Sequence, residues 1–207
     1  MTGVYPNVHA RIRWTRRAPG APPSITTTAI WLHGDRFHIR DEAGRAYSEI
    51  VGDVTEPRGF GLMPQTVEDF LETWTDPSAG PGETTDLYGD LTTGEGLVRE
   101  PGRSWETAAA MIAPVAAQLL SIGRDQGLEP VGERYHLGRD CLEFETFREG
   151  ADNGRGFRTS VRWLSCGPFV LLHEVSDAEN AGLCTRREVI ELAEGVVDDC
   201  EVRPPSR

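Results

Sequence analysis

The stretch WLHGDRFHIRD, residues 31–41, decides the fold. Polar and apolar side chains alternate over residues 36–40, and the Gly34-Asp35 pair readily supplies the positive backbone angles of a two-residue hairpin loop. The chain reverses again around residues 42–44, so two hairpins follow one another within residues 26–50. This pattern predicts an antiparallel meander.

The stretch from residue 8 to residue 14 shows which face of a strand is buried. Its apolar residues fall on one side of an extended chain and its basic residues on the other. The apolar set is Val8, Ala10, Ile12 and Trp14. A slip of one residue in the pairing would expose this whole set, so the register of the sheet is strongly specified.

The middle of the chain predicts loops and helices. Residues 52–64 are rich in Gly and Pro and indicate a loop. Residues 66–74 carry apolar side chains at helical spacing, and Thr66 can cap a short helix there. Residues 76–102 are rich in Pro, Gly, Thr and acidic residues, and we expect a long flap with one short strand near Leu97 and Val98.

The strongest helix signal runs from Ser104 to Gly127. Its apolar residues form a broad stripe, Gly127 can end the helix, and Pro114 should bend it because proline removes a backbone hydrogen bond. We expect this helix to pack on a sheet or to act as a lid over a ligand. The final third returns to strands, which are predicted at residues 129–136, 140–147, 157–164, 169–175 and 186–192.

The order of these elements is strands, then helices, then strands. It predicts an α+β class, in which a curved antiparallel sheet has its helices gathered on one side. A chain of 207 residues with 38% hydrophobic content can bury a normal core, so we expect a single domain over residues 1–207.

Composition narrows the classes of function. All 21 basic residues are Arg, which excludes chemistry that needs a lysine, such as a Schiff base or a phosphate-loop lysine. The formal net charge of −12 argues against nucleic-acid binding, because neutralising phosphates supplies most non-specific affinity. An acidic surface suits a basic protein partner, and it equally suits plain solubility.

The four cysteines give no zinc or redox signature. Cys141, Cys166, Cys184 and Cys200 are widely spaced, and we expect free thiols in a reducing compartment, or two disulfides of open connectivity after export. No apolar run reaches the roughly 18 residues of a membrane span, and the first residues lack the order of a secretion signal. The sequence as written predicts a cytoplasmic protein, or a periplasmic or otherwise extracytoplasmic one if a leader has been removed.

No residue pattern indicates catalysis, a cofactor or a metal. His33 and His38 flank the hairpin turn, but two ligands do not make a metal site. A nucleophile in Ser165-Cys166-Gly167, with His173 as its base, would lack the strand-to-helix turn of a nucleophile elbow, since Gly167-Pro168 indicates a turn between strands. We therefore predict neither metal nor cofactor and favour a binding protein over an enzyme, for which the sequence offers no supporting triad or metal set.

Three stretches together resemble the lipoprotein carrier superfamily of the outer-membrane sorting pathway. They are residues 30–41, 137–144 and 192–205, and the last of them ends in an acidic stretch and a proline pair. The resemblance implies an unclosed antiparallel half-barrel whose concave, apolar side is covered by helices and receives an acyl chain or a similar molecule. The chain departs from the family because a strand is predicted by Val8, where the family has a signal and an amphipathic helix before its first strand.

The function implied by the resemblance is that of a binding protein for an apolar small molecule or a lipid-like group. Burial of apolar surface contributes roughly 25 cal/mol per Å², so lid and ligand would compete for the same concave surface. The expected lining residues, for each of which core packing is the alternative, are Trp14, Trp31, Phe37, Ile39, Phe144, Val161 and Trp163. The alternative function is an acidic interaction module of the immunity or adaptor type, which engages a basic protein partner through its convex face and the 76–102 loop.

Overall fold

The computed structural model describes residues 6–45, 83–108, 119–120, 127–152, 155–177 and 184–205. These residues form eleven strands and one short 3-10 helix. The strands are β1 (Val8–Arg17), β2 (Ser24–His33), β3 (Arg36–Asp41), β4 (Thr85–Asp90), β5 (Gly96–Arg99), β6 (Glu106–Ala108), β7 (Gly132–His136), β8 (Arg139–Asp152), β9 (Arg155–Cys166), β10 (Phe169–Asp177) and β11 (Cys184–Glu194). The 3-10 helix is η1 (Asp199–Val202).

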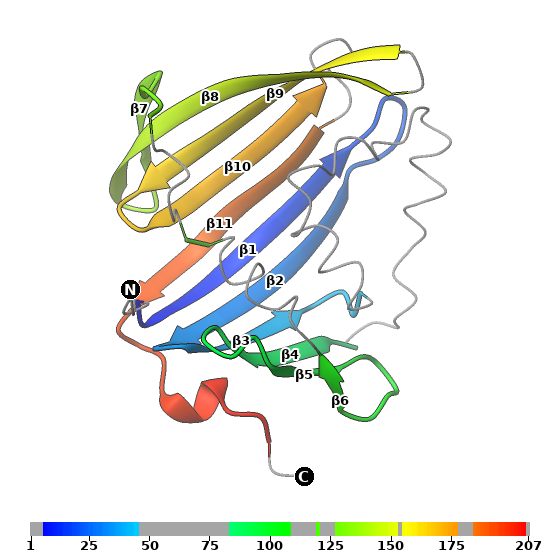
Figure 1. Cartoon of the computed structure of the whole chain (residues 1–207), viewed down its shortest axis with the longest axis vertical. Coiled ribbons are helices and arrows are strands. Elements are labelled where there is room, and N and C mark those ends of the chain that lie inside the picture. The colour runs from blue at the N-terminus through cyan, green and yellow to red at the C-terminus, as the bar shows by residue number, and fades with distance from the viewer. Residues whose placement is uncertain are drawn as a thin grey trace.

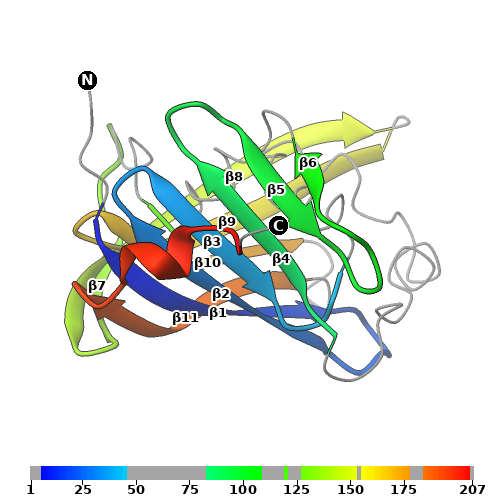
Figure 2. The same cartoon turned by 90° about the horizontal axis from the view of Figure 1, so that it is seen from below.

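All eleven strands belong to one antiparallel sheet, in the order β6-β5-β4-β3-β2-β1-β11-β10-β9-β8-β7. Each half of the sheet is a meander in which strands that follow one another in sequence pair. The two halves are joined by β1 and β11, which pair from Val8 opposite Glu194 to Arg17 opposite Cys184. The sheet does not close into a barrel, because β6 and β7 are its two unpaired edges within the described residues (Figure 1). Figure 2 shows the curvature of the sheet from below.

The antiparallel, unclosed sheet was expected, but the predicted α+β class is wrong. The architecture is all-β, since the described residues contain no α-helix that could cover the concave side. The helix predicted from Ser104 fails at its start, where Glu106–Ala108 is strand β6, paired with β5. The apolar spacing of this segment is a local property, whereas the backbone hydrogen bonds offered by the free edge of β5 arise only in the folded chain.

Two further residues of that predicted helix lie against β10. Leu120 forms a bridge with Phe169, and the Val170 N–H donates to the Leu119 carbonyl at 3.0 Å. The remainder of the predicted 104–127 helix between Ala108 and Gly127, and the helix predicted at residues 66–74, lie outside the described residues.

The hairpin predicted at Gly34-Asp35 is confirmed. His33 pairs with Arg36 across the two-residue loop, and Gly34 has a φ of 62°, which a residue with a side chain rarely adopts. The short strand expected near Leu97 and Val98 is β5. The surrounding 76–102 stretch is not a simple flap, however, because β4 also forms within it and pairs with β3.

Strand alternation gives the sheet two faces, which we name from β1. The inner face carries Val8, Ala10, Ile12 and Trp14, and the outer face carries His9, Arg11 and Arg13. Residues directly opposite one another on paired strands share a face. The register therefore adds Ile30 and Leu32 of β2, and Phe37 and Ile39 of β3, to the inner face.

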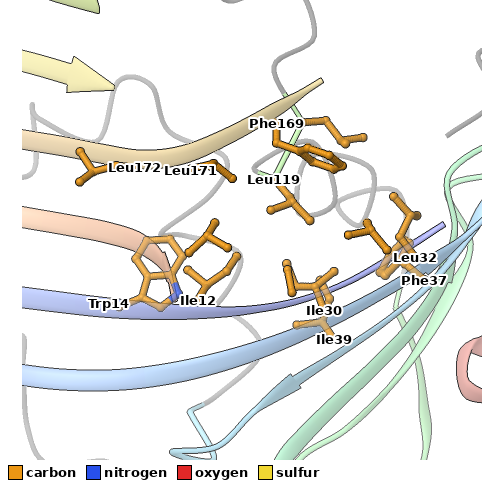
Figure 3. Close-up of a cluster of buried hydrophobic side chains, with 14 of the residues drawn as sticks. Ile12, Trp14, Ile30, Leu32, Phe37, Ile39, Leu119, Phe169, Leu171 and Leu172 are labelled. Carbon is orange, nitrogen blue, oxygen red and sulfur yellow. The ribbon is translucent and has the colours of Figure 1, made fainter. Parts of the chain in front are cut away.

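The hydrophobic core of the described residues consists of two clusters of buried apolar side chains. One cluster of buried apolar side chains draws on every strand except β7, together with Leu119 and Leu120. Figure 3 shows Ile12 and Ile30 on one side of this cluster, with Leu119 and Phe169 facing them. A second, smaller cluster consists of Phe144, Val161, Trp163, Val170 and Val175. Full burial of each large side chain contributes roughly 1.5–3 kcal/mol.

The outer face of the central strands is charged. Arg13 and Glu188, which are cross-strand partners, lie 2.7 Å apart, and Arg162 and Glu145 lie 3.2 Å apart. Such pairs satisfy a solvated sheet face without a second layer of structure. No helix in the described parts of the chain is both long enough and apolar enough to cross a membrane.

Candidate functional site

A row of five facing side chains crosses the inner face from β1 to β8. The register places Trp14 opposite Arg187, and Arg187 opposite His173. Trp163 lies opposite both His173 and Phe144, and its ring stacks on that of Phe144 with centroids 5.5 Å apart. The row therefore places a guanidinium and an imidazole between aromatic side chains.

Arg187 is the cationic member of this row, and only 4% of it is exposed. It shares the inner face with Val189, two residues further along β11, which lies opposite Ile12. Removing a guanidinium from water costs several kcal/mol unless a negative charge or a set of hydrogen-bond acceptors compensates. The inner face is therefore not uniformly apolar.

A second buried polar group lies beside Trp14. The fully buried Asp41 carboxylate accepts hydrogen bonds from Arg45 NH2 at 2.7 Å and Nε at 3.0 Å, and from Thr28 Oγ1 at 3.2 Å. The turn after β3 holds this pair, because the backbone N–H groups of Ala43 and Arg45 both donate to Asp41 Oδ1 at 3.1 Å. The guanidinium carbon of Arg45 lies 5.9 Å from the Trp14 ring centroid.

Trp14 lies next to both buried arginines, Arg187 and Arg45. Arg187 lies opposite it on β11, and Arg45 lies over its ring. Trp14 is 8% exposed, and its Nε1 has no hydrogen-bond acceptor within the described ranges. A buried indole N–H normally has a partner, and leaving one unmade costs about 1–3 kcal/mol. The site therefore offers an unused hydrogen-bond donor, which suits an oxygen acceptor such as a carboxylate.

The structure distributes the seven residues predicted to line a ligand site over three places. Trp14, Phe37 and Ile39 belong to the large inner cluster. Phe144, Val161 and Trp163 belong to the smaller cluster. Trp31 joins neither, because it lies on the outer face opposite His9 and His38. The alternation of β2 already carried this information, since Trp31 stands between the inner residues Ile30 and Leu32.

The polar residues of the inner face escaped the sequence interpretation. Asp41 and Arg45 resemble an ordinary turn in the sequence, and only the pairing of β2 with β3 brings Thr28 opposite Asp41. Arg187 follows Arg186 directly, so alternation alone cannot say which of the two is buried. The pairing of β11 with β1 and β10 decides it in favour of Arg187.

The structure gives no support to the metal and nucleophile candidates considered from the sequence, His33 with His38 and Ser165 with His173. His33 Nδ1 lies 2.7 Å from the Val197 carbonyl oxygen, whereas His38 Nε2 lies 2.9 Å from Asp86 Oδ1. Ser165 lies at the end of β9, which turns at Gly167 directly into β10. This strand-to-strand turn is not the strand-to-helix turn of a nucleophile elbow.

Fold and site together define an unclosed antiparallel sheet, within the described ranges of the chain, whose inner face combines apolar side chains with buried polar ones. The structure is similar to that of MucB in its complex with MucA(peri), with 14% identity and a TM-score of 0.38 over 96% of this chain and 54% of the MucB chain. The chain thus spans about half the length of MucB.

Two further solved structures are similar along most of both chains. A LolA superfamily protein from Nitrosomonas europaea has 10% identity and a TM-score of 0.37, over 97% of this chain and 92% of the other. A DUF1329 family protein from Desulfovibrio piger has 10% identity and a TM-score of 0.34, over 96% and 90%. The LolA superfamily is the lipoprotein carrier superfamily that the sequence resembles. No protein-family model and no curated protein matches the sequence.

Proposed function

We propose that the protein is a non-enzymatic binding protein that holds an amphipathic molecule, with an apolar chain and an anionic head group, against its inner face. The observation that carries this proposal is the buried Trp14 indole N–H, which lacks an acceptor in the described part of the chain. The head group would accept a hydrogen bond from Trp14 Nε1. Arg187, directly opposite on β11, would lie close to its negative charge.

The apolar part of the ligand is supported by the apolar side chains that the inner face carries, among them Ile12, Phe37 and Ile39. A sheet with an apolar face needs a cover, and within the described residues no second sheet packs on the inner face. Each methylene group transferred from water to such a surface contributes about 0.8 kcal/mol. A long acyl chain is therefore a suitable occupant, and a fatty acid is the simplest molecule that combines such a chain with a carboxylate.

Binding of palmitate tests this proposal, with methyl palmitate as the matched ligand that lacks the negative charge. Native mass spectrometry and a thermal-shift titration should both detect the acid. Trp14→Phe keeps an aromatic ring but removes the N–H donor, so the affinity for palmitate should fall roughly tenfold, the equivalent of 1.4 kcal/mol for one charge-assisted hydrogen bond. The affinity for the ester should fall much less, because a neutral acceptor forms a weaker hydrogen bond.

Trp31→Phe is the matched control, because it makes the same substitution on the outer face and should change neither affinity. The proposal fails if palmitate does not bind to the wild type. The placement of the head group fails if Trp14→Phe and Trp31→Phe behave alike while both variants remain folded.

The second candidate function is an acidic module that binds a basic protein partner, and the net charge of −12 favours it. Several outer carboxylates are already engaged, however. Arg11 donates to both oxygens of Glu42 at 2.9 and 3.0 Å, and Arg13 donates to Glu188 at 2.7 Å. Salt separates the two functions, since partner binding driven by charge should weaken steeply between 50 and 500 mM salt whereas apolar capture should not, as expected from a Debye length of about 10 Å at 0.1 M.

A further inference from the structure

The outer face carries a continuous stack of four rings across β1 to β4. His9, Trp31, His38 and Tyr88 are successive cross-strand partners. Their centroids are separated by 5.0 Å, 4.7 Å and 4.1 Å, and the last two pairs are nearly parallel. Two arginines, Arg40 and Arg99, lie next to this row of rings.

The adjacent cross-strand row places Asp86 between two arginines. Arg40 of β3 and Arg99 of β5 both lie opposite Asp86 of β4. Arg40 Nε donates to Asp86 Oδ1 and Arg99 NH2 donates to Asp86 Oδ2, each at 2.8 Å. Asp86 is 1% exposed, and His38 Nε2 lies 2.9 Å from its Oδ1. One buried carboxylate therefore fixes the positions of two guanidinium groups.

Both guanidinium groups are held by the carboxylate yet still reach the surface. The Arg40 side chain is 42% exposed and the Arg99 side chain is 44% exposed. The Arg40 guanidinium carbon lies 6.0 Å from the Trp31 ring centroid, and that of Arg99 lies 4.9 Å from the ring centroid of Trp105. An arginine that rests on an indole and is anchored by one nitrogen has already lost much of its side-chain entropy, so a ligand need not supply that cost.

The cluster of Asp86, Arg40 and Arg99 carries more positive than negative charge, unlike the neighbouring ion pair of Arg11 and Glu42. Two guanidinium groups share one buried carboxylate, and Arg40 uses only Nε to bind it, which leaves both terminal amino groups without a partner in the described part of the chain. Arg11, by comparison, directs its NH2 group to both oxygens of its own Glu42. Burial acts to raise the pKa of Asp86, but the hydrogen bonds from His38, Arg40 and Arg99 outweigh it and hold that pKa well below its usual range. Asp86 therefore stays ionised and keeps both arginines in place.

We propose that Arg40 and Arg99 form an outer-face binding site for a phosphate group, whose oxygens accept hydrogen bonds from the free terminal N–H groups of the two guanidiniums. Phosphate suits the site because arginine's planar fork matches its oxygens and because phosphate monoesters carry close to two negative charges at neutral pH. The phosphate can come from a free small molecule or from a lipid head group. This site is separate from the inner face and does not depend on the function proposed there.

Phosphorus NMR of inorganic phosphate, titrated with the full-length protein at constant ionic strength, tests the site. We expect saturable line broadening, and Arg40→Gln and Arg99→Gln should each weaken phosphate binding at least tenfold. Arg11→Gln is the matched control, because it removes a positive charge from the same face without touching the site, and it should change binding less than twofold. Circular dichroism of each variant checks that the sheet is intact, and two independent site variants keep the test valid if one of them fails to fold.

Sedimentation with vesicles identifies the source of the phosphate. Vesicles that contain phosphatidic acid present a phosphate monoester, and vesicles of phosphatidylcholine serve as the control. Binding of inorganic phosphate alone indicates a free ligand, whereas vesicle binding that is lost in Arg40→Gln and Arg99→Gln indicates a head group. The proposal is overturned if neither probe binds, or if Arg11→Gln weakens binding as much as the site variants do. Palmitate binding by Arg40→Gln should equal that of the wild type, which separates this site from the inner one.

Discussion

Replacement of Asp86 by Asn should destabilise the protein by about 2–3 kcal/mol. The substitution keeps the size of the side chain but removes the charge that accepts hydrogen bonds from His38, Arg40 and Arg99 at 2.8–2.9 Å. Hydrogen bonds to a charged group contribute roughly 1.5–3 kcal/mol each. The expected loss is smaller than the sum of three such contributions, because Arg40 and Arg99 are more than a third exposed. Water therefore solvates both guanidiniums once the carboxylate charge is lost.

Urea unfolding followed by circular dichroism measures this loss, and the melting temperature should fall by roughly 4–10 °C for a chain of this size. Glu149→Gln is the matched control. Glu149 is 74% exposed and lies 3.5 Å from Arg158 Nε, and such a surface pair contributes no more than about 1 kcal/mol. A loss below about 0.5 kcal/mol in Asp86→Asn, or a loss equal to that of the control, would refute the account of Asp86 as a buried hub.

The same variant carries a pH signature. The pKa of Asp86 is lowered in the folded protein, so its stabilising effect is fully present above the pKa of the unfolded state, near 3.9, and is lost as the pH falls below it. The difference in unfolding free energy between wild type and Asp86→Asn should therefore shrink as the pH falls from 5 towards 3. A difference that grows as the pH falls from 5 to 3 would contradict the assigned direction of the shift.

Three more outcomes follow from burial and backbone geometry. Phe37→Ala should cost about 3–5 kcal/mol in urea unfolding because Phe37 is fully buried, whereas Phe147→Ala should cost far less because Phe147 is 50% exposed. Gly34→Ala should cost about 1–2 kcal/mol, because φ at this position is 62°, and a neutral result would show that the turn can relax. Burial and the neighbouring Cys166 raise the pKa of Cys141 to about 11, so iodoacetamide should label the exposed Cys200 well before Cys141 at pH 8, and equal rates measured by mass spectrometry would exclude this protection.

The strands that could be predicted are those whose signal is local. The hairpin at Gly34-Asp35 follows from a dipeptide that tolerates positive φ and from the alternation on either side of it. The helix predicted from Ser104 was wrong where it can be compared, because Glu106–Ala108 completes the edge of β5. A stripe of apolar residues reports that a segment is buried, but it does not report which backbone partner the segment will find.

The candidate sites divide in the same way. Trp14 and Phe37 were predicted as inner residues because apolar side chains at alternate positions must leave water. Asp86 could not be singled out, because its partner Arg40 is 46 residues away and only the pairing of β3 with β4 brings the two together. Trp31 shows that alternation must be applied strictly, since it was expected to line the ligand site but its position in β2 places it on the outer face.

Composition and alternation alone were sufficient to predict an antiparallel sheet with one apolar and one charged face. Both signals depend on residues that are close together in the sequence. Only the tertiary structure showed that the described residues form an all-β fold and that β1 pairs with β11. It also placed buried polar residues beside Trp14. The physical reason is that β1 meets β11 across almost the whole chain, with Arg13 and Glu188 separated by 175 positions. Backbone hydrogen bonds select such partners by register, and no local pattern encodes that choice.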